Sequence, residues 1–434
     1  MMRIWITTAI VLMTGVVGAQ HELAFFNMDS LWSRNFLNPA EASHHNWTIS
    51  LPEVYLGFNH SGDPFADILS VDDKTLVIDK DKWLSNLSDI NTLYGRNDIP
   101  TLGIAHRFGQ FTVSLAHQFR NTYDILYPKD MVELAVNGNA SYIGQSLQIG
   151  PGIRFGSYSE FGLGLTWESS NLSVGGRFKY LNGIQYLESK NSSLSLFTDE
   201  DIYRLRFNTD YELISSSFIN SIDLETLTFD REATDLNQWV TSNPGIALDL
   251  GVKANVAGFI EIEMALLDLG SINWKDNVKQ FKSEGEFTYE GLDVDDLIDV
   301  DSLAFEEIVD SVKNILEFKE ASLNSFTQTL PRRLYLAGQV RLNSQWKLSL
   351  LYSNETFFDE SDSAYALGVR YQPFTWWSLG LTGANRFEDF NLGFSSRMNL
   401  GPIQIYGVSD NILGLFTLNE LSNSNVRLGA NVIF

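Results

Sequence analysis

The sequence predicts an all-β fold, a transmembrane antiparallel β-barrel of about 14 strands with long extracellular loops and a short N-terminal plug segment. Three observations lead to this prediction. Apolar and polar residues alternate over stretches of about nine to eleven residues, the length that a tilted membrane strand needs. Tight turns alternate along the chain with long connections, and an apolar, alternating stretch ends on Phe434.

Apolar residues recur at every second position over much of the chain, a pattern that predicts strands with one apolar face. The clearest case is residues 102–119, where two alternating stretches meet at Gly109 and Gln110 and predict a hairpin. Residues 47–59 and 426–434 add one strand each to the six hairpins, which gives about 14 strands. The other five hairpin turns are expected near residues 169–171, 256–258, 343–344, 374–375 and 401–402.

The connections between hairpins are mostly long, whereas those within hairpins are short. Outer-membrane barrels place tight turns at one end and long loops at the other. A soluble β-sandwich also has alternating strands, but it does not segregate its connections by length in this way. The expected long connections cover roughly residues 60–99, 122–156, 188–244 and 275–331, with shorter ones near 358–363 and 414–424.

The C-terminal decapeptide NVRLGANVIF has one fully apolar face. As a free edge strand it would invite aggregation, whereas in a closed barrel it pairs with the first strand, expected at residues 47–59. A terminal strand ending in Phe also resembles the signal that the outer-membrane assembly machinery recognises. Phe434 is therefore the expected assembly signal.

The first 19 residues have the anatomy of a cleaved secretory signal peptide. Arg3 supplies the positive charge, Ile4 to Val17 form an apolar stretch too short for a spanning helix, and Ala19 ends a small-residue cleavage site. The mature chain is expected to begin at Gln20. Together with the strand pattern, this predicts a protein of the bacterial outer membrane that contacts lipid and lipopolysaccharide.

Several classes of function are not expected. A net charge of −24 argues against nucleic-acid binding, and the absence of cysteine removes disulfides and thiol chemistry. No nucleophile elbow, zinc-protease motif, phosphate-binding loop or dinucleotide fingerprint occurs, so neither an enzyme nor a cofactor is predicted. His44 and His45 lack a further ligand at metal-binding spacing, and no metal site is predicted.

The polar faces of the predicted strands, which face the lumen of a membrane barrel, carry an excess of basic residues. Two interpretations stay open: the cations form ladders with the acids and brace the wall, or they attract an anionic ligand or an acidic plug. Candidate ligand-binding residues are Arg107, Arg177, Lys179, Arg333, Arg341, Arg370 and Arg427. Lys253, Lys347 and Arg397 complete the basic set, and the lumen acids are Glu168, Asp249, Glu261 and Glu263.

The stretch 275–331 is expected to be an acidic, partly helical extracellular loop. Apolar residues at helical spacing predict an amphipathic helix there, which either packs on other loops or docks a protein partner. The run from Asp293 to Asp301 lacks the glycine and final glutamate of a calcium-binding EF-hand, so it predicts loose binding of divalent ions at most. The apolar face of the helix comprises Phe305, Ile308, Val309, Val312, Ile315 and Leu316.

Asn38, Pro39 and Ala40 stand just before the first predicted strand. With about 14 strands, long outer loops and a final Phe, this motif resembles the FadL superfamily of long-chain fatty-acid transporters. It looks closest to a divergent Bacteroidota branch that includes PorV, a shuttle of the type IX secretion system. The resemblance implies a plug or hatch at residues 20–46 and a barrel at 47–434, with a lateral opening that passes hydrophobic substrate.

Two functions follow as hypotheses. The first is a plugged transporter for a hydrophobic or amphipathic anionic molecule that meets the lumen arginines. A barrel filled by its own side chains and N-terminus would count against it. The second is a non-transporting scaffold whose acidic loops dock other outer-membrane or secreted proteins, as the resemblance to PorV suggests.

Overall fold

The computed structural model defines most of the barrel and its N-terminal segment. Two predicted features lie outside the described residues: the signal peptide at 1–19, and the amphipathic helix with Phe305, Ile308, Val309, Val312, Ile315 and Leu316. The described residues are 22–61, 69–72, 75–200, 204–217, 222–223, 228–229, 242–289, 318–357, 360–386, 389–412 and 423–434.

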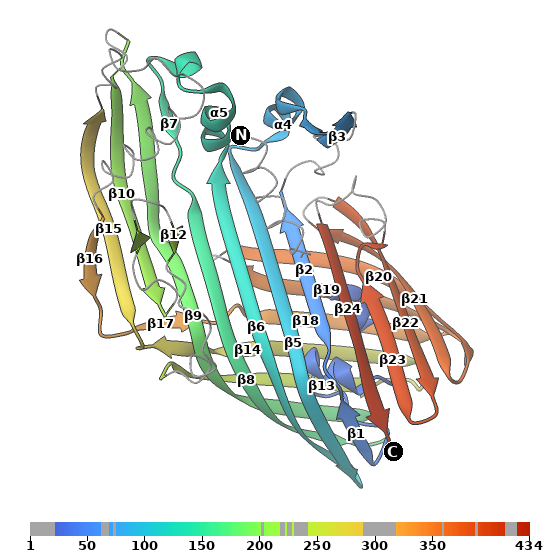
Figure 1. The fold of residues 1–434 in the computed structure, drawn as a ribbon. Coiled ribbons are helices and arrows are strands. Elements are labelled where there is room, and N and C mark those ends of the chain that lie inside the picture. The colour runs from blue at the N-terminus through green and yellow to red at the C-terminus, as the bar shows by residue number, and fades with distance from the viewer. Residues whose placement is uncertain are drawn as a thin grey trace.

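Within this part of the chain, 14 antiparallel strand positions close into a ring, as the sequence predicts (Figure 1). The last strand pairs with the first, because Thr48 lies opposite Ile433 and Val54 lies opposite Leu428. In order around the ring these are β1 (Trp47–Ser50) with β2 (Val54–His60), β5 (Ile90–Phe108), β6 (Phe111–Pro128), β8 (Gly152–Glu168), β9 (Leu172–Thr198), β13 (Pro244–Asn255), β14 (Ile260–Trp274), β17 (Phe326–Thr329) with β18 (Arg333–Arg341), β19 (Trp346–Phe357), β20 (Glu360–Phe374), β21 (Trp377–Arg386), β22 (Asp389–Leu400), β23 (Ile403–Ser409) and β24 (Asn423–Ile433).

The six predicted hairpin turns all lie at one end of the ring, which we call the tight-turn end. The first strand starts there and the last strand ends there. The amide of Phe434 donates a hydrogen bond to the carbonyl of Trp47 at 3.0 Å, which joins the end of the last strand to the start of the first. This pairing leaves no free edge at the seam. The role of Phe434 as an assembly signal stays a prediction.

A second group of strands extends the wall beyond the ring at the opposite, long-loop end. The far part of β9 pairs with β7 and β10, β10 pairs with β15, and β15 pairs with β16 (Figure 1). Much of this extension falls where the sequence predicts only long connections. Its strands are β7 (Ser146–Gln148), β10 (Leu205–Ser216), β15 (Val278–Tyr289) and β16 (Lys319–Ser322).

Short elements accompany the long-loop end. Two small hairpins lie outside the main sheet, and no helix in the described part of the chain is long and apolar enough to cross a membrane. These elements are β3 (Leu69–Asp72) with β4 (Thr75–Ile78), β11 (Ile222–Asp223) with β12 (Thr228–Phe229), α4 (Lys80–Asn86), α5 (Lys129–Asn137) and η2 (Ala140–Tyr142).

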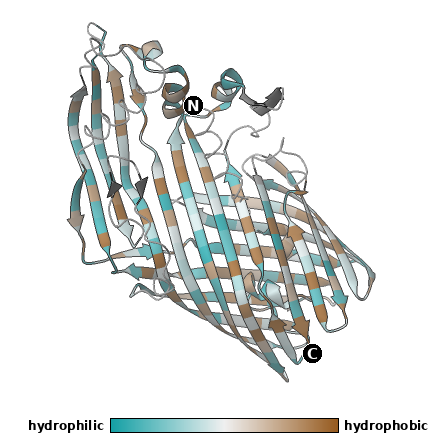
Figure 2. Cartoon of the chain, in the orientation of Figure 1, coloured by the Kyte–Doolittle hydropathy of each residue, from teal (hydrophilic) through white to brown (hydrophobic). Residues whose placement is uncertain are grey.

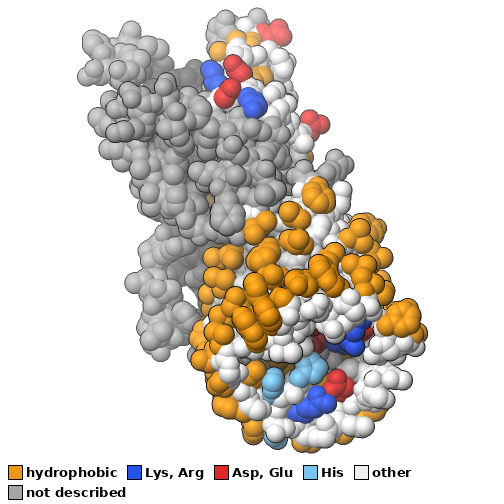
Figure 3. All heavy atoms as spheres, turned by 90° about the vertical axis from the view of Figure 1, so that its right-hand side faces the viewer, with side chains coloured by type: hydrophobic (Ala, Val, Ile, Leu, Met, Phe, Trp, Pro, Cys, Tyr) orange, Lys and Arg blue, Asp and Glu red, His pale blue; other side chains and the backbone are white. Residues whose placement is uncertain are grey.

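The outer wall of the ring is apolar, as a barrel that spans a bilayer requires. Leu115, Leu163 and Leu367 are 56%, 57% and 68% exposed, although leucine is usually buried in water-soluble proteins. Hydropathy alternates along the strands in Figure 2, and Figure 3 shows hydrophobic side chains gathered over the barrel wall. Exposed aromatic side chains at the tight-turn end match an interfacial girdle, among them Phe108, Phe111, Phe259, Phe374 and Trp376.

The core of the molecule lies inside the ring, around the N-terminal segment (residues 22–46). This segment contains one turn of helix, α2 (Leu23–Phe26), and a 3₁₀ helix, η1 (Trp32–Phe36), and all residues of both helices are buried. The carboxylate of Asp410 accepts hydrogen bonds from the amides of Leu23 and Ala24, at 3.1 and 2.5 Å. It thereby satisfies two of the amides that the start of a helix leaves unpaired.

Candidate functional site

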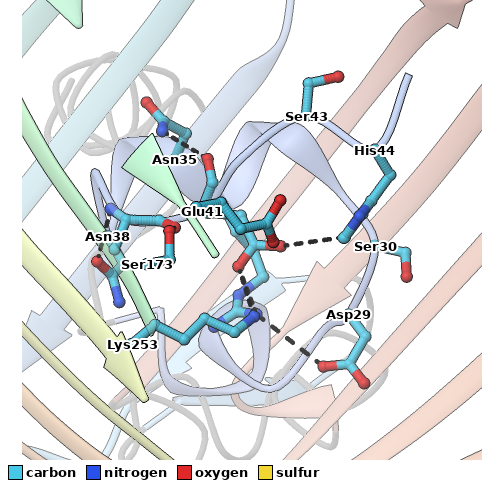
Figure 4. A network of polar contacts seen from close by, with 12 residues as sticks. Asp29, Ser30, Asn35, Asn38, Glu41, Ser43, His44, Ser173 and Lys253 are labelled. Atoms are coloured by element: carbon cyan, nitrogen blue, oxygen red, sulfur yellow. Dashed lines mark hydrogen bonds and ion pairs between the residues drawn. The ribbon is translucent and has the colours of Figure 1, made fainter. Parts of the chain in front are cut away.

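The candidate site is the lumen, where the N-terminal segment is bound to the wall by backbone and charged contacts. The turn at Asn38–Ala40 forms because the Asn38 side chain accepts a hydrogen bond from the amide of Ala40 at 3.0 Å. Thr166 of β8 donates to the carbonyl of Pro39 at 2.7 Å. Ser173 of β9 donates to the carbonyl of Ala40 at 2.6 Å, and Ser173 lies beside Asn38 in Figure 4.

Two glycines of the wall make room for this turn. A Cβ atom added to Gly175 would overlap the carbonyl group of Pro39, and one added to Gly251 would overlap the side-chain oxygen of Asn38. A carbonyl of the backbone cannot move aside as the end of a flexible side chain can. The wall is therefore shaped around the Asn38–Ala40 turn.

We expect Gly175→Ala to displace the turn and expose the N-terminal segment. Its added methyl group meets backbone atoms, so the turn has to move for the barrel to accommodate it. Gly176→Ala is the matched control, because the nearest atom to its Cβ, the carbonyl oxygen of Asp249, lies at an ordinary 3.7 Å. The measurement is trypsin cleavage after Arg34 in detergent. Equal cleavage of the two variants would contradict the tight seat.

Arg34 is the central cation of the segment and is fully buried. Its guanidinium contacts Glu263 of β14 at 2.8 Å and Glu41 at 3.2 Å. Glu263 also accepts from Asn38 at 3.1 Å and from Gln339 at 2.6 Å, so this buried carboxylate has partners from both the segment and the wall. Charged hydrogen bonds of this kind are the stronger class in proteins.

Glu41 extends the network toward the tight-turn end (Figure 4). It contacts Lys253 of β13 at 3.2 Å and lies 4.0 Å from the ring of the exposed His44. Asp29 makes a second group, with Lys347 at 2.9 Å and Arg370 at 3.0 Å.

Two carboxylates of the segment, those of Asp29 and Glu41, are held in the charged form. Burial alone raises the pKa of Asp29, but Lys347 and Arg370 outweigh it and bring the pKa well below its usual range. The pKa of Glu41 is also lowered, because Lys253 and Arg34 outweigh the effect of burial. A depressed pKa stabilises the seated state at pH values above the ordinary carboxylate range, and the contribution is lost as the pH falls through the depressed pKa.

The N-terminal segment should therefore remain seated as the pH falls from about 8 to about 5, where both carboxylates stay ionised even at their ordinary pKa. Hydrogen exchange of peptides from residues 22–43, corrected for the intrinsic effect of pH, measures this directly. Constant protection over this range is expected. Protection that is already lost near pH 6 would contradict the assignment of Asp29 and Glu41 as permanent anions.

The start of the segment presents a carboxylate followed by an apolar helix. Glu22 lies 2.5 Å from Arg427, 3.6 Å from Arg96 and 4.0 Å from Arg333, residues of β24, β5 and β18. Phe25 stacks on Tyr406 at 5.6 Å between ring centroids, and Phe26 stacks on Tyr335 at 5.4 Å. The wall around α2 includes apolar side chains, most of them small, namely Ala337, Leu351, Ala364, Ala366 and Ala384.

A further cluster joins strands to each other near the middle of the lumen. Asp268 of β14 contacts Lys179 at 2.7 Å, Arg333 at 2.7 Å and Arg120 at 2.9 Å. Lys179 also contacts Asp249 at 2.8 Å. All five side chains are buried.

The structure brings most of the predicted lumen cations together, but not all of them. Arg177, Lys179, Arg333, Arg370 and Arg427 are buried in the lumen. Arg107 lies at the mouth, 2.7 Å from Glu168 and half-exposed. Arg341 is exposed at the tight-turn end, where it joins neither cluster. The proposed role of these seven residues in ligand binding stays a prediction.

Several residues of the site are missed by reasoning from the sequence. Arg96 and Asp98 fall in a stretch expected to be a loop, which instead continues β5. By the alternation of β14, Asp268 falls on the face whose side chains point to lipid. A β-bulge between β13 and β14 turns its side chain into the lumen instead. Asp268 also has a left-handed backbone, with φ of 63°, which is uncommon for a residue other than glycine.

Little empty space remains beside α2. A cavity of about 10 Å³, the room of roughly one water molecule, lies between Phe26, Asn27 and the wall of β18 to β21. Among the described residues, no group of three or more His, Cys, Asp or Glu side chains has the arrangement to hold a metal ion.

The sequence model of a family described as "Family of unknown function (DUF5723)" matches residues 39–410. The chain belongs to this family. The matched region begins at Pro39 in the lumen turn and ends at Asp410, the residue that caps α2. A comparison with curated proteins finds no match.

Three similar solved structures are described as transporters or as a FadL homologue. The toluene transporter TbuX of Ralstonia pickettii is 10% identical, with 93% of this chain and 94% of that chain covered and a TM-score of 0.45. A FadL homologue of Pseudomonas aeruginosa is 11% identical, with 94% and 95% covered and a TM-score of 0.45. The toluene transporter TodX of P. putida is 8% identical, with 92% of each chain covered and a TM-score of 0.45.

The Bacteroidota branch and the relation to PorV stay predictions.

Proposed function

We propose that this protein is an outer-membrane barrel that passes an amphipathic anionic small molecule, and that its N-terminal segment closes the lumen in the resting state. The observation that carries the proposal is the arrangement around Glu22 and α2. Three guanidinium groups surround one carboxylate, and an apolar wall follows directly beside it. A small molecule with a negative head and an apolar tail has the same distribution of charge.

The wall offers each part of such a molecule a partner. Arg427, Arg96 and Arg333 favour an anion in a site that excludes water, where charges attract more strongly than in solution. Tyr335 and Tyr406 present ring faces, and the neighbouring alanines leave room for a tail once Phe25 and Phe26 withdraw. Glu22 and α2 would then compete with the ligand for one place.

The described lumen is filled, so passage requires the N-terminal segment to move. A filled lumen counts against a plugged transporter in this closed state, because the cavity beside α2 holds about one water molecule. Ser30 has a left-handed backbone, with φ of 54°, between α2 and η1. Residues 22–29 can swing about this position while the Asn38–Ala40 turn stays seated.

Binding of dodecyl phosphate in non-ionic detergent tests the proposal by calorimetry. Glu22→Gln weakens the internal competitor and should tighten binding several-fold. Arg427→Gln removes a cation from the head-group site and should weaken it. Arg206→Gln is the control, because Arg206 lies outside the lumen cluster with a 43% exposed side chain. Equal binding by all four proteins, or none, would overturn the proposal.

A second function, a scaffold for protein partners, is favoured by the extension of the wall. β9, β10, β15 and β16 project past the ring, and Asp210, Glu284 and Glu286 are exposed on them. Isolation of the intact protein from native membranes in mild detergent tests it. A stable complex that Glu284→Lys with Glu286→Lys disrupts would support a scaffold, and a lone monomer would contradict it.

A further inference from the structure

We infer that the lumen is closed a second time, by the cluster around Asp268, and that this closure persists when the N-terminal segment leaves. We call this cluster the septum and define it as Asp98, Arg120, Glu160, Lys179, Asp249, Asp268 and Arg333. The inference goes beyond the proposed ligand, since it concerns the barrel wall alone.

The septum is held mainly by contacts between strands, and residues 22–46 add only the approach of Glu22 to Arg333 at 4.0 Å. Asp268 of β14 contacts Arg120, Lys179 and Arg333, which belong to β6, β9 and β18. Arg120 also contacts Asp98 of β5 at 3.4 Å and Glu160 of β8 at 3.5 Å. None of these pairs includes a residue of the segment, so we expect them to persist when it is displaced.

The septum crosses the lumen. Between β6 and β14 the ring contains β8, β9 and β13, so the 2.9 Å contact of Arg120 with Asp268 is a chord of the ring. On β9, Lys179 is farther from the tight-turn end than Gly175, where the Asn38–Ala40 turn is seated. The septum therefore lies on the long-loop side of that seat.

A β-bulge builds the septum. Leu248 lies opposite Leu269 and Leu250 lies opposite Leu266, so Asp249 faces two residues of β14. Leu267 and Asp268 are consequently both buried on the lumen side, which breaks the alternation of β14. The amide of Asp268 donates to the carboxylate of Asp249 at 2.8 Å, which fixes the left-handed backbone. Bulges that re-aim a side chain in this way are features of function or strain.

The charges within the septum nearly balance, so we expect its ion pairs to stay formed and the septum to remain closed. It contains four carboxylates and three cations, and each cation contacts at least one carboxylate. Pulling a buried ion pair apart without replacing its partners is strongly unfavourable. Displacing the N-terminal segment exposes one side of the septum but removes none of these contacts.

Single-channel recording in planar bilayers tests the inference, with the whole chain in every variant. Gly175→Ala with Gly251→Ala displaces the segment, and trypsin cleavage after Arg34 verifies the displacement. We expect this double variant to remain electrically silent. Adding Asp268→Asn, which removes the charge that holds three cations together, should produce steady ion conductance. Conductance from the double variant alone, or silence of the triple variant, would overturn the septum.

Folding of each variant is checked by its heat-dependent mobility on gels. If the triple variant does not fold, Arg120→Met replaces Asp268→Asn, because it removes the chord while leaving Asp268 with Lys179 and Arg333. The same two outcomes then apply. Asp268→Asn in the otherwise unchanged chain should stay silent, since the seated N-terminal segment still fills the lumen below.

Discussion

Arg34→Met is expected to lower the free energy of unfolding by about 3–5 kcal/mol, the usual loss when one member of a buried ion pair is removed. The substitution leaves Glu263 and Glu41 buried without the guanidinium that now lies 2.8 and 3.2 Å away. Methionine keeps most of the side-chain volume, so the loss reports on charge and not on a cavity. Urea unfolding in lipid vesicles, followed by gel mobility, measures the change.

Two companion variants make this result specific. Arg206→Gln removes an arginine whose side chain is 43% exposed and whose ion pair spans 3.9 Å, and should change the stability by about 1 kcal/mol at most. Arg34→Met combined with Glu263→Gln should recover part of the loss, because one unpaired charge is gone. An Arg34→Met protein as stable as the wild type would show that the N-terminal segment is not held by this pair.

Trp274→Ala should also cost about 3–5 kcal/mol, because it leaves a cavity in place of the largest fully buried side chain among the described residues. Trp274 stacks on Tyr186 at 5.2 Å, and its ring nitrogen donates to Gln328 at 3.0 Å. It also fills the space that Gly183 leaves on β9. These contacts join the ring to its extension at the long-loop end.

The control for Trp274 is Trp274→Phe, which keeps an aromatic ring but loses the hydrogen bond and part of the volume. It should cost less than half as much as Trp274→Ala in the same urea titration. If both substitutions are neutral, the ring and its extension are not coupled through this side chain.

The barrel was predictable from the sequence because apolar and polar residues alternate over most of the length of its strands. Each of the six hairpins and the pairing of residues 47–59 with the C-terminal strand is confirmed by the strand register. The same alternation correctly placed five cations on the lumen side of the wall: Arg177, Lys179, Arg333, Arg370 and Arg427. When one face of a strand is apolar, the polar residues between the apolar ones have to point to the opposite face.

Two kinds of feature could not be predicted: side chains whose direction depends on a break in the alternation, and contacts between residues that are distant in sequence. Asp268 was missed because a bulge of one residue reverses the side to which it points. Nothing in the local sequence around Glu22 indicates that Arg427, more than four hundred residues away, is its partner. The strands of the extension pair mainly with each other beyond the ring, so residues 188–198 and 205–216 were taken for a connection.

A single cross-link tests most directly whether the N-terminal segment lies inside a closed ring. The chain has no cysteine, so two introduced cysteines report without interference. The side chains of Ser33 and Asn431 meet at 3.2 Å, and Asn431 lies opposite Ser50 at the seam. Ser33→Cys with Asn431→Cys should form a disulfide readily, whereas Ser33→Cys with the outward-facing Ala430→Cys should not. Equal cross-linking of the two pairs, or none in the first, would contradict the seated segment.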